Sequence, residues 1–172
     1  MDLSTLAPSD AAVALRGFER RYRGLFFGLG EDESPEDLAH RPYQGWSAIE
    51  HIVAAAWAIA ALERALAAVL TADTPALDAT DVDPGARPKP GAPTGTVHER
   101  IAELGIEANA MADRIERVPA EDWARTGALA GTGRTTSALD LARLAVDAGV
   151  THLRAAEQVL AAVRGKPIDP QA

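Results

Sequence analysis

Four histidines are the residues of this 172-residue chain best suited to acid–base or metal chemistry, since it contains no cysteine. His152 follows a largely apolar run and precedes Leu153, so we expect it to be partly buried. Buried polar groups need hydrogen-bond partners, and we expect the partner of His152 on the second long helix. His40 and His98 are expected at the surface, and His51 on a polar or boundary face near a helix start.

Several other chemistries are excluded by residue type. Without cysteine the chain forms no disulfide, no thiolate metal site and no cysteine nucleophile. The Ser and Thr cluster at 132–137 has no His or Lys at a spacing that would activate a hydroxyl. The glycines at 131 and 133 lack the lysine and the preceding strand of a phosphate-binding loop.

Three capping boxes predict where three long helices begin. Each pairs a Ser or Thr with an acidic residue three positions later, and the pairs are Ser47–Glu50, Thr96–Glu99 and Ser137–Asp140. The corresponding helices cover about residues 48–70, 97–117 and 138–165. An apolar stripe predicts a further long helix over 9–29, ended by Gly28 and Gly30. Short helices are predicted from Pro35 and Pro119, and no segment predicts a strand.

The composition agrees with a helical protein. Ala and Leu dominate while Ile, Thr, Tyr and Phe are few, a mixture that favours helix over strand. A chain of 172 residues is long enough for one domain with a sizeable core. We therefore predict an all-α fold, an antiparallel four-helix bundle, in a single domain over residues 1–172.

The segment 71–95 differs from the rest of the chain, with five prolines and three glycines. Such a long connection within a compact domain is unusual. It can be a crossover joining non-adjacent ends of the second and third long helices. A mobile surface loop is the alternative, and the sequence leaves both open.

Charge and hydropathy bear on partners and location. The net charge of −8 is a poor match for nucleic acid, whose phosphates attract Lys and Arg. The longest apolar run, residues 52–62, is shorter than the roughly 20 residues that span a membrane. The first ten residues have neither the basic nor the apolar region of a signal peptide. We expect a cytoplasmic protein without nucleic-acid or membrane partners.

Two segments resemble the DinB-like superfamily of helical bundles, which includes thiol transferases. Residues 41–51, RPYQGWSAIEH, resemble the entry of that family into its second helix. Residues 121–163, with a Gly-rich loop before TTSALDLARLAVDAGVTHLRAAEQVL, resemble its last helix. The resemblance implies an up-down bundle with a long crossover, often dimeric. It also implies a divalent metal bound by three histidines, which activates a low-molecular-weight thiol or a water.

The three ligand positions that the resemblance implies are largely altered in this chain. They fall on Ala54 in the second long helix and on Ala148 and His152 in the last. Reading the last pair one residue earlier gives Asp147 and Thr151. Only His152 keeps a side chain of the expected type.

Carboxylates could take the place of the missing histidines. Glu50 lies one turn before Ala54 on the same helix face, although its capping box also explains it. Asp147 lies about 100° around the helix from Ala148. A site of Glu50, His152 and Asp147 would suit zinc or nickel. Trp57 shares the face of Ala54 and could fill the space there.

Three hypotheses for function follow. The first is a DinB-like protein that has lost the three-histidine site and is a structural or small-molecule-binding bundle without a cofactor. Its cavity would be lined by Trp46, Glu50, Ala54, Trp57, Asp147, Ala148 and His152. The second is a zinc- or nickel-dependent enzyme of thiol S-transferase or hydrolase type, using His152 with the carboxylates. The third is an interaction module that forms a homodimer.

Overall fold

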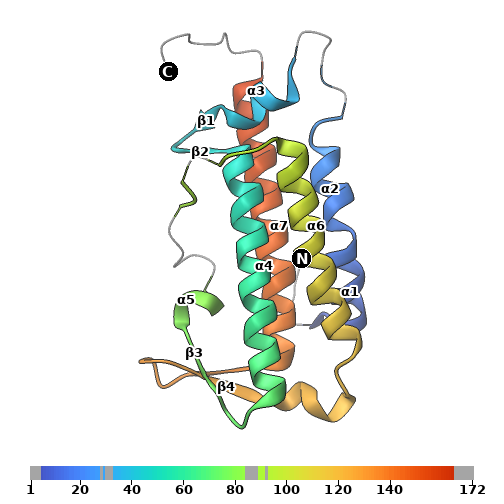
Figure 1. Ribbon diagram of the computed structural model, residues 1–172, viewed down its shortest axis with the longest axis vertical. Helices are drawn as coiled ribbons and strands as arrows, with labels where there is room; N and C mark the ends of the chain where they lie inside the picture. The colour runs from blue at the N-terminus through green and yellow to red at the C-terminus, as the bar shows by residue number, and fades with distance from the viewer. Residues whose placement is uncertain (1–4, 28, 30–32, 84–88, 92, 165–172) are drawn as a thin grey trace.

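The computed structural model describes residues 5–27, 29, 33–83, 89–91 and 93–164. This part of the chain is mostly helical, with a small amount of sheet (Figure 1). The elements that run along the length of the molecule are α1 (Pro8–Arg16), α2 (Phe18–Gly24), α4 (Ala48–Thr71), α6 (Val97–Glu116) and α7 (Ala138–Val163). The short helices are α3 (Pro35–His40), α5 (Ala79–Val82) and the 3₁₀ helix η3 (Ala120–Ala124).

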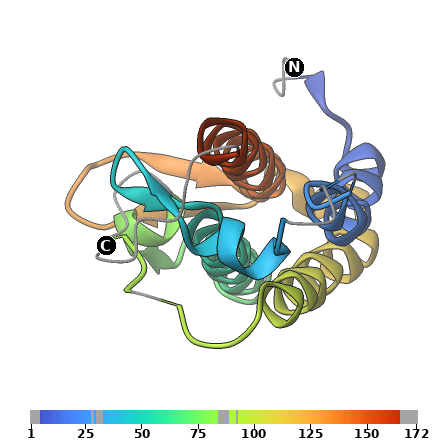
Figure 2. The ribbon, with the colours of Figure 1, turned by 90° about the horizontal axis from the view of Figure 1, so that it is seen from above.

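The long helices bury one shared core. Helix α4 packs against both α6 and α7, while α1 and α2 cover the remaining sides of α6 and α7 (Figure 2). The core is formed by side chains from all of these helices, including Phe18, Ile52, Leu104 and Leu141. Its stability comes from removing this apolar surface from water.

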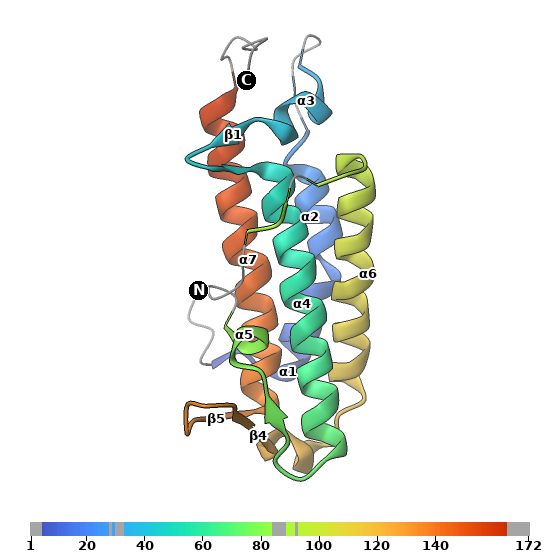
Figure 3. The same cartoon turned by 60° about the vertical axis from the view of Figure 1, so that its left-hand side comes forward.

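Helices α4 and α6 run in the same direction, whereas α7 runs opposite to α4 (Figures 1 and 3). The ion pair of Glu63 with Arg114 joins the later halves of α4 and α6, at 2.5 Å. The connection after α4 therefore returns along the molecule to reach the start of α6, which makes it a crossover. Helices α4 and α7 are antiparallel, as predicted, and the crossover predicted between the second and third long helices accounts for the parallel direction of α4 and α6.

All three predicted capping boxes are confirmed. In each, the Ser or Thr side chain accepts a hydrogen bond from the backbone three residues later, and the acidic side chain accepts one from the cap residue. The helix ends also agree closely, since α4 ends at Thr71 and α6 at Glu116. The predicted end of the last helix, Gly165, lies outside the described residues.

The first long helix was predicted as one continuous helix over residues 9–29. The structure instead divides it into α1 and α2. Gly17 separates α1 from α2, and its backbone N–H is shared between the carbonyls of Val13 and Ala14, at 3.3 and 3.2 Å. Glycine weakens a helix interior because it loses the most backbone freedom on folding. Helix α2 ends at Gly24, and the predicted stops at Gly28 and Gly30 lie outside the described residues.

The absence of strands was a wrong prediction. Strands β1 (Pro42–Tyr43) and β2 (Trp46–Ser47) form an antiparallel hairpin. Strand β4 (Thr126–Leu129) pairs with β3 (Ala76–Leu77) in parallel and with β5 (Thr135–Ser137) in antiparallel fashion. These strands have two to four residues each, too few to show the alternating pattern by which strands are recognised.

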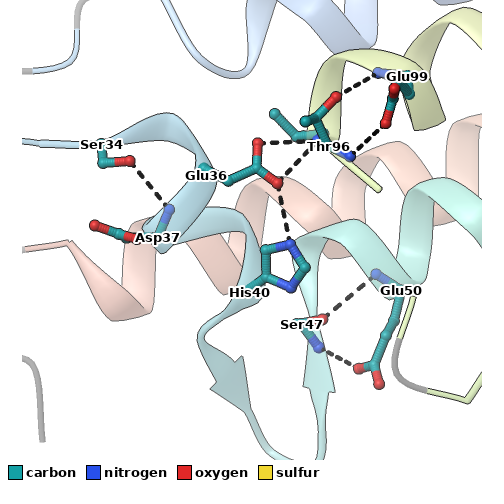
Figure 4. Close-up of polar contacts among 9 residues, drawn as sticks. Ser34, Glu36, Asp37, His40, Ser47, Glu50, Thr96 and Glu99 are labelled. Atoms are coloured by element: carbon teal, nitrogen blue, oxygen red, sulfur yellow. Dashed lines mark hydrogen bonds and ion pairs between the residues drawn. The ribbon is translucent and has the colours of Figure 1, made fainter. Parts of the chain in front are cut away.

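Helix α3 is tied to the start of α6 by one carboxylate (Figure 4). Both oxygens of Glu36 accept from the backbone N–H of Val97, at 3.1 and 3.0 Å. Glu36 also contacts His40 Nε2, at 3.1 Å, and Ser34 caps the same short helix, as predicted. A negative group at the positive end of α6 is favourable, so α3 is fixed over this end of the molecule.

Helix α4 is the one described helix that is long and apolar enough to cross a membrane. In an apolar stretch of 18 residues within α4, 67% of the residues are buried against the rest of the chain. Burial of this kind is typical of the central helix of a helical core, which passes the same test of length and composition.

Helix α7 packs against Phe18 at a position where glycine leaves room for the ring. A Cβ on Gly149 of α7 would lie 2.2 Å from Phe18 Cε2, and the Gly149 carbonyl accepts a hydrogen bond from the Tyr22 hydroxyl at 2.7 Å. Gly149→Ala should therefore lower the free energy of unfolding by about 1–3 kcal/mol. Gly24→Ala is the matched control, since its Cβ would be 3.9 Å from Phe27 and alanine favours helix. Urea unfolding of both variants checks this, and equal stabilities would contradict the packing described.

Candidate functional site

The β1–β2 hairpin places Trp46 directly before the start of α4. Its turn uses Gln44 and Gly45 with positive φ angles of 51° and 87°, a conformation that suits tight hairpins. The hairpin lies against both α4 and α7. Because Ser47 is the N-cap of α4, the indole is held next to the first turn of that helix.

His51 of α4 and His152 of α7 face each other across the helix interface. Their Nδ1 atoms are 3.2 Å apart and their ring centres 5.5 Å apart. The Trp46 ring stacks on His51, with centres 4.7 Å apart and planes 15° from parallel. The Trp46 and His152 ring centres are 6.4 Å apart. These three rings, from β2, α4 and α7, are named the histidine-pair site below.

The Nδ1–Nδ1 contact fixes complementary tautomers. One imidazole must donate through Nδ1–H while the other accepts through an unprotonated Nδ1. The donor then has an unprotonated Nε2, and the acceptor has an Nε2–H. The pair thus retains one hydrogen-bond acceptor and one donor that the contact does not use.

Both histidines are neutral near pH 7. Burial, and after it the nearby His51 ring, lowers the pKa of His152 to about 4. Burial also lowers the pKa of His51, and Lys89 acts in the same direction while Glu50 opposes it. Neutral imidazoles can accept hydrogen bonds or bind metals without first losing a proton.

Glu50 has two separate roles at the edge of this site. Its Oε2 accepts from the Ser47 backbone N–H at 2.7 Å and completes the capping box (Figure 4). Its Oε1 forms an ion pair with Lys89 of the crossover, at 2.9 Å. Burial alone would raise the pKa of Glu50, but the Ser47 N–H and Lys89 together hold it below its usual value.

The structure brings together only some of the predicted site residues. Trp46 lies near His152, while Glu50 is held at the start of α4 by Ser47 and Lys89. Ala54 is half-buried and Ala148 is buried, whereas Asp147 is exposed. Trp57, which the sequence suggested could fill the space beside Ala54, is 52% exposed.

His51 is the residue of the histidine-pair site that the sequence did not identify. It was predicted on a polar or boundary face, and its role as the partner of His152 was not recognised. Its neighbours Ala48, Ile52 and Ala55 are all buried, which puts position 51 at the margin of the face toward α7. The apolar residues at this helical spacing were the sequence signal that could have placed His51 near α7.

A three-ligand metal centre does not fit these residues. Nowhere in the described parts of the chain do three or more His, Asp or Glu side chains gather closely enough to hold an ion. The alanines at 54 and 148 carry no ligand atoms. The histidine pair supplies two nitrogens, and the exposed Asp147 does not complete them.

A separate groove of about 460 Å³ lies at the other end of the molecule. It is formed where the later parts of α4 and α6 meet η3, and its walls include Leu70, Ala110, Arg117 and Pro119. It does not include the histidine-pair site.

Comparison with known proteins gives no match, whether to a family model, to a curated protein or to a solved structure.

The buried His152 should make stability depend on pH. In the unfolded chain its pKa is near 6.5, and in the folded protein it is about 4, so the unfolded state binds more protons between these values. The free energy of unfolding should therefore fall as pH decreases from 6.5 to 4, and the fall should be smaller in His152→Gln. The exposed His98→Gln is the control. Urea unfolding across this range tests the prediction, and parallel curves for all three proteins would refute it.

Proposed function

We propose that the chain is a DinB-like protein that binds a small molecule at the histidine-pair site and lacks the three-histidine metal centre. In this proposal α4, α6, α7 and the interrupted α1–α2 form the four-helix bundle of that superfamily. The long crossover and the Trp46–Ser47 entry into α4 support the assignment. The observation that carries the function is the facing pair of His51 and His152 beside Trp46.

The chemistry of the site indicates what kind of molecule fits. The pair leaves one ring nitrogen as a donor and one as an acceptor, and Trp46 adds aromatic surface. Polar groups placed in a partly buried position are costly unless they are hydrogen-bonded. A small planar molecule that carries both a donor and an acceptor would satisfy them.

Pyrazole is a suitable probe, since it is neutral and planar and has one donor and one acceptor nitrogen. It should shift the NMR signals of the Trp46 indole and the His152 ring in a saturable manner. His152→Ala should weaken binding several-fold, up to about tenfold, through the loss of a hydrogen bond.

Matched substitutions test whether the effect is local. The exposed His98→Ala and Trp57→Ala should bind pyrazole like the unmodified protein. If His152→Ala and Trp46→Ala also bind it unchanged, the histidine pair is not the binding site.

A metal-dependent enzyme of thiol S-transferase or hydrolase type is the second candidate. It is favoured by the 3.2 Å separation of the two Nδ1 atoms. Two nitrogens each about 2.0–2.1 Å from a tetrahedral zinc would be separated by a similar distance. The missing third ligand weighs against it, since Asp147, one of the carboxylates that could supply it, is exposed.

Zinc or nickel titration of untagged protein, followed by calorimetry, separates the two candidates. The proposed function predicts no stoichiometric, tight metal binding, because two ligands and no completed shell give weak affinity. One equivalent bound tightly, and lost in both His51→Ala and His152→Ala, would favour the enzyme.

A further inference from the structure

An ammonium group is already held at the edge of the histidine-pair site, and it belongs to Lys89 of the crossover. Its Nζ lies 2.9 Å from Glu50 Oε1 and 5.9 Å from the centre of the Trp46 ring. A carboxylate and the face of an indole are two groups that attract an ammonium ion strongly. Glu50 and Trp46 thus form a site that suits a cation, and the ammonium group of Lys89 occupies it.

We propose that Trp46 and Glu50 form a binding site for the ammonium group of a small amine, and that Lys89 occupies this site when the amine is absent. The inference rests on the proposed function and adds an ammonium group to the ligand class proposed there. Lys89 then acts as an internal competitor.

Glu50 can exchange its cation without loss of the α4 cap. Its Oε2 is engaged by the Ser47 N–H, so only Oε1 depends on Lys89. The Glu50 side chain is 10% exposed, and an uncompensated buried carboxylate is strongly unfavourable. Whenever Lys89 leaves, the site therefore favours another cation in its place.

The position of Lys89 allows its side chain to separate from Glu50. Its side chain is 43% exposed, in contrast to that of Glu50, and it lies outside the long helices. Its exchange with a free amine needs no rearrangement of the helical core. The ion pair joins residues far apart in the sequence, so an amine that displaces Lys89 also frees the crossover at this point.

The other groups at the site favour an amine over an acid. His51 and His152 are neutral and do not repel a cation, and one of their ring nitrogens can accept its N–H. A carboxylate ligand would meet the negative charge of Glu50. The net charge of −8 also attracts cations to the protein as a whole.

Lys89→Met removes the internal ammonium and keeps most of the side-chain length. Butylammonium should then bind with at least about tenfold higher affinity than to the unmodified protein, because the site is no longer occupied. The indole NMR signals of tryptophan-labelled protein report the binding, with the Trp46 signal assigned from Trp46→Phe. Lys89→Met with Glu50→Gln should lose the gain, while the capping box persists because glutamine also accepts at this position.

Butanol and butyrate are the matched probes, since they have the same chain with a neutral or negative head. Neither should bind Lys89→Met comparably. Equal binding of butanol or butyrate, or no gain from Lys89→Met, would overturn the ammonium site. Pyrazole in the same titration separates the two proposals. If pyrazole binds and butylammonium does not, only the ligand class is wrong, and if neither binds, the proposed function fails as well.

Discussion

The carboxylate of Glu50 is the interaction on which this end of the molecule depends. One oxygen accepts the Ser47 N–H and so fixes where α4 begins. The other holds Lys89 and so fastens the crossover to the same turn. Because Trp46 immediately precedes Ser47, the cap also sets the position of the indole. His51 follows Glu50 directly, and the same helix start therefore directs it toward α7.

Helix α7 supplies His152, the other histidine of the pair. Helix α7 can approach α2 closely because Gly149 has no side chain where Phe18 packs, and Tyr22 bonds the Gly149 carbonyl. His152 lies one turn further along α7. There His152 faces His51 of α4, and its burial lowers its pKa.

Local sequence signals predicted the elements well and the site only in part. The caps of α4, α6 and α7 were predicted because a capping box is contained in four residues. The break at Gly17 was missed although glycine weakens a helix interior, and the strands were missed because they are only two to four residues long. His152 was recognised as partly buried with a partner on the second long helix, whereas His51 was not identified as that partner. The pairing depends on the rotation of two helices, which a single sequence does not specify. The contact of Lys89 with Glu50 depends on the path of the crossover, and no local pattern encodes it.

Two neutral histidines that share one hydrogen bond between their Nδ1 atoms define the histidine-pair site. Long-range ¹H–¹⁵N NMR of the imidazole rings at pH 7 measures the tautomer of each histidine directly. We expect His51 and His152 to adopt opposite tautomers, one protonated at Nδ1 and the other at Nε2. Two rings with the averaged tautomers and the ordinary titration of free histidine would contradict it.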